Sequence, residues 1–177
     1  MGSLFSHVSP ADAIGLLGLV LSAAAGTCKS DRRMRSMITL SALIWGAHWY
    51  LIGAKTAAAV SLVSSARHGT AQWTQNQSKV VSRRLLGVFS VISLTTGLYL
   101  WSNWTSSIPL CASLWSTYGY FRFKGLKLRK WSQYANAFWL TNAIALGSIP
   151  ALATSALIIT TNFVGQWRLR RTTLASA

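Results

Sequence analysis

The positive charges of this chain are confined to short clusters separated by long uncharged stretches. The 177 residues include 17 lysines and arginines but only two acids, Asp12 and Asp31. The clusters read CKSDRRMR, SKVVSRR, FRFKGLKLRK and WRLRR. A nucleic-acid-binding protein spreads such charge over a face that follows phosphates, whereas apolar segments between basic loops are typical of a membrane protein. We therefore expect the lipid bilayer as a partner and no nucleic acid.

The apolar stretches predict seven helical segments, most of them 17 to 20 residues long. That length is at the short end of what crosses a bilayer core of about 30 Å. The expected segments are approximately residues 11–27, 37–54, 56–73, 85–101, 106–122, 131–148 and 149–171. The sequence thus predicts an all-α polytopic membrane protein in which residues 1–177 form a single membrane domain.

The basic residues also fall on alternate loops between these segments. With Arg67 set aside, 15 lysines and arginines fall on one side and Lys55 alone falls on the other. Lysine and arginine collect in the cytoplasmic loops of membrane proteins. This asymmetry predicts a multi-pass protein with its N-terminus outside and its C-terminus in the cytoplasm.

An internal repeat appears when the chain is compared with itself at an offset of 94 residues. Eight of the 45 positions from Lys29 to Trp73 are then identical. The identical residues are Arg35 and Arg129, Trp45 and Trp139, Gly53 and Gly147, Ala57 and Ala151, Ala59 and Ala153, Ser61 and Ser155, Gln72 and Gln166, and Trp73 and Trp167. Three segments per repeat would invert the second copy, and one extra segment restores its direction. We expect parallel triple-helix repeats at 11–73 and 106–171, joined by a linker helix at 85–101 (3+1+3).

Three stretches of the chain resemble a known family. They are AHWYLIG in the second segment, FRFKGLKLR after the fifth, and TTNFVGQWR at the end of the seventh. They are similar to the bacterial inner-membrane protein family typified by YgjV, and the 3+1+3 plan resembles the SWEET and PQ-loop transporter superfamily. The resemblance implies the inner membrane of a bacterial cell, with the N-terminus in the periplasm.

The resemblance to SWEET transporters also implies candidate residues for binding a solute. Such proteins use an asparagine from the third helix of each half and aromatic or small residues from the second. Asn162 stands at the matching place in the last segment, and His68 is its repeat mate. Trp45 and Trp139 are the matching aromatic residues, for which packing and ligand stacking are both open.

Arg67 is the most unusual residue of the apolar segments. It lies 11 residues beyond Thr56, or about 16 Å along a helix at 1.5 Å per residue. An arginine at that depth costs from about 3 kcal/mol upward unless it is solvated or paired. Three interpretations stay open: the side chain snorkels to the interface, it lines a water-filled cavity, or it coordinates an anion.

His48 and its repeat mate Asn142 are polar residues within apolar helices. They favour either an interhelical hydrogen bond or the lining of a cavity. No carboxylate pair, metal-ligand spacing or phosphate-binding loop is present, so we expect no enzyme, no catalytic residue, no metal and no cofactor.

These observations favour a facilitative transporter of a small neutral or anionic solute, carried through a cavity between the repeats. The candidate binding residues are Arg67, Asn162, Trp45, Trp139, His48, Asn142 and His68. The alternative is a membrane scaffold, or a receptor for a small ligand or lipid, on the same fold. A homodimer is left open.

Overall fold

The computed structural model describes residues 9–28, 30–74 and 76–175, with side chains described as far as Trp167. These residues form α-helices, one 3₁₀ turn and no strand, so the expected all-α class is confirmed. The helices are α1 (Pro10–Thr27), α2 (Asp31–Leu51), α3 (Lys55–Trp73), α4 (Lys79–Tyr99), α5 (Ser107–Arg122), α6 (Gly125–Ala145) and α7 (Ile149–Ala175), with η1 at Trp104–Ser106.

Three helices begin six residues, or about 1.7 turns, earlier than the apolar pattern predicts. α2, α4 and α6 start at Asp31, Lys79 and Gly125 rather than near 37, 85 and 131. The basic clusters therefore form first turns of helices and not loops, because lysine and arginine are good helix formers. Each of these helices has 21 residues, or about 32 Å at 1.5 Å per residue.

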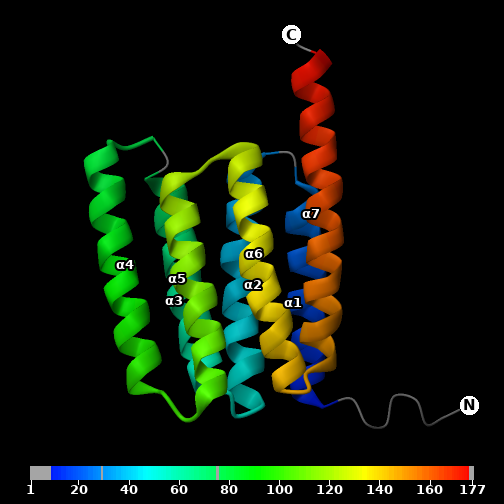
Figure 1. Cartoon of the computed structure of the whole chain (residues 1–177). Helices are drawn as coiled ribbons and strands as arrows, with labels where there is room; N and C mark the ends of the chain where they lie inside the picture. The colour runs from blue at the N-terminus through cyan, green and yellow to red at the C-terminus, as the bar shows by residue number, and fades with distance from the viewer. Residues whose placement is uncertain (1–8, 29, 75, 176–177) are drawn as a thin grey trace, which may run out of the picture.

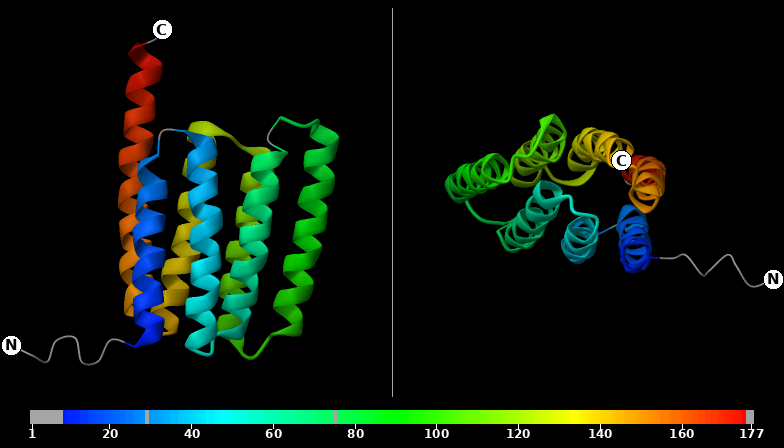
Figure 2. Two further views of the ribbon diagram at one scale, coloured as in Figure 1. Left: turned by 180° about the vertical axis from the view of Figure 1, so that it is seen from behind. Right: turned by 90° about the horizontal axis from the view of Figure 1, so that it is seen from below.

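The helices stand in two facing rows (Figures 1 and 2). One row holds α1, α2 and α3, and the other holds α7, α6 and α5. α1 packs against α7 at one end of the rows, and α3 packs against α5 at the other. α4 lies outside this arrangement, against α3 and α5. The layout agrees with two parallel halves joined by α4, while the equivalence of the halves stays a prediction.

The basic residues gather at one end of the bundle. The connections from α1 to α2, from α3 to α4 and from α5 to α6 all lie at the end where α7 finishes, which is the top of Figure 1. Lys55 begins α3 at the opposite end. We call the end with these three connections the basic end, and the end where Lys55 lies the opposite end.

Three helical segments are long and apolar enough to cross a membrane by length and composition: Pro10–Thr27, Lys79–Tyr99 and Ile149–Trp167. α5 has only 16 residues, and α2, α3 and α6 are less apolar. These four helices bury polar side chains inside the bundle. Examples are Arg35, Ser64, Thr117 and Asn142, all of which are buried.

Arg129 joins α6 to the end of α1 at the basic end. Its side chain is 1% exposed. One guanidinium nitrogen, Nη2, donates to the carbonyl oxygen of Cys28 at 2.6 Å, and Nη1 donates to that of Gly26 at 3.4 Å. Asp31 lies 3.9 Å from Nη2. The carbonyl groups that end a helix have no partner within it, so this arginine satisfies them.

Arg35 makes the reciprocal connection from α2 to the end of α5. It is also 1% exposed, and it donates to the carbonyl oxygens of Tyr120 at 3.3 Å and Phe123 at 3.4 Å. Arg35 and Arg129 are 94 positions apart, as are Gly26 and Tyr120. Each row thus sends one arginine from its middle helix to the end of a helix in the other row. We call the pair the arginine braces.

We predict that Arg129→Gln lowers the free energy of unfolding by about 3 kcal/mol, because two hydrogen bonds from a charged donor and one ion pair are lost from a buried site. The measurement is unfolding of the purified protein in detergent. Lys130→Gln is the matched control: it removes an exposed charge from the next residue and is expected to change stability by less than about 0.5 kcal/mol. Equal losses in the two variants would contradict the role of the brace.

Candidate functional site

A cavity of about 160 Å³ lies between the two rows of helices. All three helices of each row line it, and α4 does not. At about 30 Å³ per molecule in the liquid, this volume corresponds to roughly five waters, or to one small solute. The site is therefore central, and both rows contribute to it.

One face of α3 supplies polar groups to the cavity. Ser61, Ser64 and His68 are three and four residues apart, so their side chains lie on the same side of the helix, and all three line the cavity. Ser64 Oγ and His68 Nδ1 are buried without a hydrogen-bond partner among the described residues. A buried polar atom without a partner is costly. Hydrogen bonds within the described part of the protein therefore leave these two atoms unsatisfied.

Arg67 lies beside this face and also lines the cavity. Its side chain is 1% exposed and points to α5. Nη1 donates to the carbonyl oxygen of Ser113 at 2.8 Å, to the Ser113 hydroxyl at 3.0 Å and to the Thr117 hydroxyl at 2.8 Å. Nε is buried with no partner in the described part of the chain. Snorkelling to the interface is thus wrong as an interpretation of Arg67, because α5 offers acceptors inside the bundle.

The facing surface of α1 and α2 carries a small hydrogen-bonded group. The hydroxyls of Ser22 and Ser41 are 2.6 Å apart, and the indole N–H of Trp45 donates to Ser22 Oγ at 3.3 Å. Across the cavity, α7 contributes Ser155 and Asn162. Hydroxyl, amide and indole groups therefore surround the cavity on several sides, together with apolar surface.

An aromatic layer bounds the cavity toward the opposite end. The rings of Trp49 and Trp139 stack across the two rows, with 6.2 Å between their centroids. Small residues of α3, α6 and α7 pack around them: Ala57, Ala58, Ala143 and Ala151. Packing of apolar side chains therefore holds the two rows together at this level.

His48 connects the helices just beyond that layer. Its Nδ1 lies 2.8 Å from the carbonyl oxygen of Ala11, and its Nε2 lies 2.9 Å from the hydroxyl of Ser148. The residue joins α2 to the start of α1 and to the turn between α6 and α7. It is 1% exposed and does not line the cavity.

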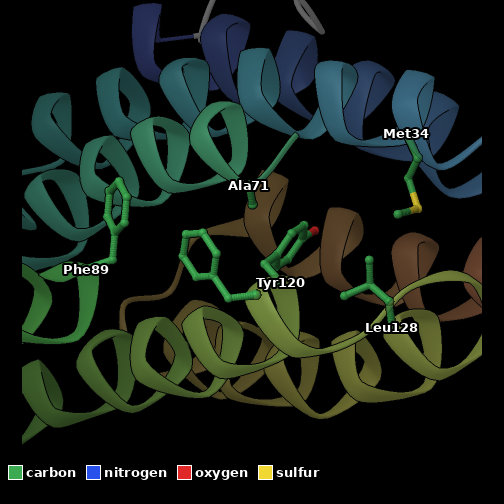
Figure 3. Packing of buried hydrophobic residues seen from close by; sticks show 6 residues of the cluster. Met34, Ala71, Phe89, Tyr120 and Leu128 are labelled. Atoms are coloured by element: carbon green, nitrogen blue, oxygen red, sulfur yellow. The ribbon is translucent and has the colours of Figure 1, made fainter. Parts of the chain in front are cut away.

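A second layer bounds the cavity toward the basic end. Figure 3 shows Met34 and Leu128 pointing toward each other from opposite rows, with Tyr120 and Ala71 beside them. Met34 and Tyr120 line the cavity from this side. The arginine braces start from the same region, because Arg35 and Arg129 directly follow Met34 and Leu128 in the sequence. The contacts between the rows at this level therefore combine packing with charge.

Five of the seven candidate binding residues line the cavity, and two do not. Arg67, His68, Trp45, Trp139 and Asn162 come together there from both rows. His48 and Asn142 lie outside it, and both are 1% exposed. For His48 the interhelical hydrogen bond is the arrangement present. The role of the other five in binding stays a prediction.

Sequence reasoning missed several lining residues. Ser61 and Ser64 share the helical spacing of His68, which was readable without a structure. Tyr120 carried no such signal, because its place depends on how α5 meets α2 and α3. The repeat gives a further signal: nine pairs of lining residues are 94 positions apart, among them Ser22 with Ser116 and His68 with Asn162.

The described residues contain no group of three or more His, Cys, Asp or Glu side chains that could hold a metal ion. Neither acid of the chain lines the cavity: Asp31 is next to Arg129, and Asp12 caps the start of α1 by accepting from Ser9. The chemistry available in the cavity is hydrogen bonding, aromatic stacking and one positive charge.

Comparison with known proteins gives two matches. The family Imp-YgjV, described as bacterial inner membrane protein, matches residues 10–173. The inner membrane protein YgjV of Escherichia coli (strain K12) is 21% identical over 164 residues, which cover 91% of this chain and 86% of that protein. No solved structure matches the chain.

We predict that the cavity holds water in the membrane, because buried polar atoms without partners line it. With Cys28 and Cys111 replaced by serine, Ser61→Cys is expected to react with a small hydrophilic thiol reagent in intact membranes. Leu62→Cys is the control, since this neighbour is 51% exposed on the outer surface of the bundle, where lipid excludes such a reagent. The measurement is the rate of labelling. Faster labelling of residue 62 than of residue 61 would contradict a wet cavity.

Proposed function

The chain belongs to the Imp-YgjV family of bacterial inner-membrane proteins, and we propose that it is a facilitative transporter of a small neutral or anionic solute. The observation that carries this proposal is the cavity in the middle of the bundle, which combines a mostly apolar lining with a few polar groups and lies between two packed layers. A scaffold has no use for buried polar atoms without partners around an internal space, because each one lowers its stability.

The contacts available to the solute suit a compact molecule with several hydrogen-bonding groups. Ser64 and His68 supply polar atoms that no group in the described part of the chain satisfies. Trp45 and Trp139 supply flat apolar surface, and Asn162 supplies an amide. Small-molecule sites combine mostly apolar lining with a few placed polar groups, and this cavity has that composition.

Transport requires the two layers that bound the cavity to open in turn. Toward the opposite end, the Trp49–Trp139 stack holds the rows together. Toward the basic end, Met34, Leu128, Tyr120 and the arginine braces do so. The two layers use different interactions. A movement of one row of helices against the other can therefore break the contacts of one layer and keep those of the second.

Facilitated diffusion is proposed rather than proton coupling. Proton-coupled carriers commonly use acidic residues within the membrane as relays. The only acids of this chain are Asp12 and Asp31, and neither lines the cavity. We also propose that the protein is not an enzyme: Ser64 and His68 line the cavity, but no acidic residue does so.

The proposed orientation puts the basic end in the cytoplasm and the N-terminus in the periplasm. Its support is the gathering of lysine and arginine at the basic end, which follows the positive-inside tendency. The bilayer and one small solute are the proposed partners, nucleic acid is not, and a homodimer stays open.

The first test is binding. We expect at least one compound from a panel of sugars, nucleosides, amino acids and organic anions to raise the melting temperature of the purified protein. A ligand at a hundred times its Kd stabilises by about 2.7 kcal/mol. Asn162→Ala and Trp139→Leu should abolish the shift. Asn76→Ala and Trp104→Leu are matched controls at exposed positions and should leave it unchanged. A shift that survives both cavity substitutions would place the ligand elsewhere.

The second test separates transport from binding. Proteoliposomes loaded with the unlabelled compound should accumulate its labelled form by exchange, and the cavity variants should not. Binding without flux would favour the alternative, a receptor or scaffold on the same fold. Flux without exchange would indicate a channel.

A further inference from the structure

The interior of the bundle holds more positive charge than the chain can neutralise. Arg35, Arg67 and Arg129 are each 1% exposed. Asp31, at 3.9 Å from Arg129, is the one acid paired with them, and the chain's other acid, Asp12, caps the start of α1 at the opposite end. Buried charges are ordinarily paired or bound to an ion of opposite sign. Among the described residues, Arg67 has only a carbonyl oxygen, hydroxyls and an aromatic ring as partners. Arg35 has two carbonyl oxygens, the same ring and the electrostatic attraction of Asp31.

Arg67 is the member of this group that reaches the central cavity. It lines the cavity, whereas Arg35 and Arg129 do not. Only one of its guanidinium nitrogens, Nη1, makes the bonds to Ser113 and Thr117, and Nε has no partner in the described residues. The cavity thus contains one positive charge whose hydrogen bonding is incomplete.

A second, larger cavity of about 860 Å³ opens at the basic end between α3, α4, α5 and α6. No acid lines it. Its lining includes five exposed cationic side chains: Lys79, Arg83, Arg122, Lys124 and Lys127. We call this cavity the basic vestibule. A concave site lined by one sign of charge concentrates ions of the other sign.

Tyr120 separates the basic vestibule from the central cavity, because it lines both. Two guanidinium groups lie near its ring: Arg35, which lines the vestibule, at 5.2 Å from the ring centroid, and Arg67, which lines the central cavity, at 6.0 Å. The ring of His68 is 4.1 Å away. One side chain therefore stands between two positively charged compartments.

We propose that the solute of the central cavity is a small organic anion with a single negative charge, and that it enters from the basic vestibule past Tyr120. The single charge follows from Arg67, the one cationic residue of the cavity lining. The remaining groups suit a carboxylate with a short polar body: hydroxyls and the Asn162 amide around it, and the faces of Trp45 and Trp139. This inference rests on the proposed transport function and narrows its substrate class.

Formate, acetate and lactate are the probes for the charge, with acetamide and lactamide as neutral molecules of nearly the same shape. At constant ionic strength, the apparent Kd from melting-temperature shifts should be at least tenfold lower for acetate or lactate than for the matching amide. The proposal is overturned if the amides bind as well as the carboxylates. It is also overturned if none of the three carboxylates binds.

Arg67 variants test where that preference arises. Arg67→Gln should reduce the preference for lactate over lactamide to less than twofold, and Arg67→Lys should keep part of it. The lysine variant also serves if the glutamine variant does not fold. Lys55→Gln is the control, an exposed charge at the opposite end. A preference that survives in Arg67→Gln, or that is lost entirely in Arg67→Lys, would overturn the assignment to this charge.

The vestibule is tested by two triple variants that remove the same charge from the same end of the protein. Arg83→Gln/Lys124→Gln/Lys127→Gln changes the vestibule lining, and Arg32→Gln/Arg33→Gln/Lys130→Gln changes exposed residues outside it. In proteoliposomes, the first should lower the initial rate of labelled lactate uptake at least fivefold and reduce its dependence on salt. The second should change the rate by less than twofold. Equal effects of the two triple variants would show that the general surface charge sets the uptake rate, and would overturn the proposed role of the vestibule.

An anionic lipid headgroup is the other source of negative charge for the vestibule. The vestibule variant could leave the uptake rate unchanged and alter only how much more phosphatidylglycerol stabilises the protein than phosphatidylcholine does. In that case the vestibule holds lipid, and the proposed entry route of the solute is overturned. Failure of the transport function gives a different result: acetate or lactate binds with the expected preference but no flux occurs. Flux of a neutral solute without flux of any carboxylate overturns only the present inference.

Discussion

The structure depends on how a chain with two acids keeps three arginines buried. Each guanidinium group must find oxygen atoms inside the bundle, because an unpaired charge in a low-dielectric interior costs several kcal/mol. Arg35 and Arg129 find theirs at the ends of α5 and α1, where helices leave carbonyl groups without partners. Each of these two arginines thereby gains partners for its charge, satisfies the carbonyl groups at a helix end and joins the two rows.

The same constraint shapes the centre of the molecule. The helix ends do not reach Arg67, so it bonds to the side of α5 through Ser113 and Thr117. Ser113 also contacts Ser93 at 3.0 Å, which extends the polar group to α4. Between these contacts and the Trp49–Trp139 stack, the rows leave a space that their side chains do not fill. This cavity is lined by the charged Arg67 and by Ser64 and His68, which have polar atoms without hydrogen-bond partners among the described residues.

Much of the candidate site could be predicted, and the reasons for the failures are physical. Arg67 stood out as a charged residue within an apolar helix, and His68 and Asn162 were implied by the resemblance to SWEET transporters. His48 and Asn142 are also polar residues within apolar helices and yet lie outside the cavity, because an inward direction does not give depth along the bundle. Tyr120 gave no signal, since a tyrosine near the end of an apolar helix reads equally well as an interfacial anchor. The starts of α2, α4 and α6 were missed because charge was taken to end a helix.

The sequence by itself determined the helical class and the gathering of basic residues on alternate connections. Both follow from local composition, because an apolar run of this length forms a helix and every second connection lies at the same end. It also carried the 94-residue offset, which reappears in the cavity lining. Only the tertiary structure decided which helices face each other, that Arg67 bonds to α5, and that Tyr120 lies between two cavities. Those outcomes depend on contacts between residues 46 or more positions apart, and no local pattern encodes such contacts.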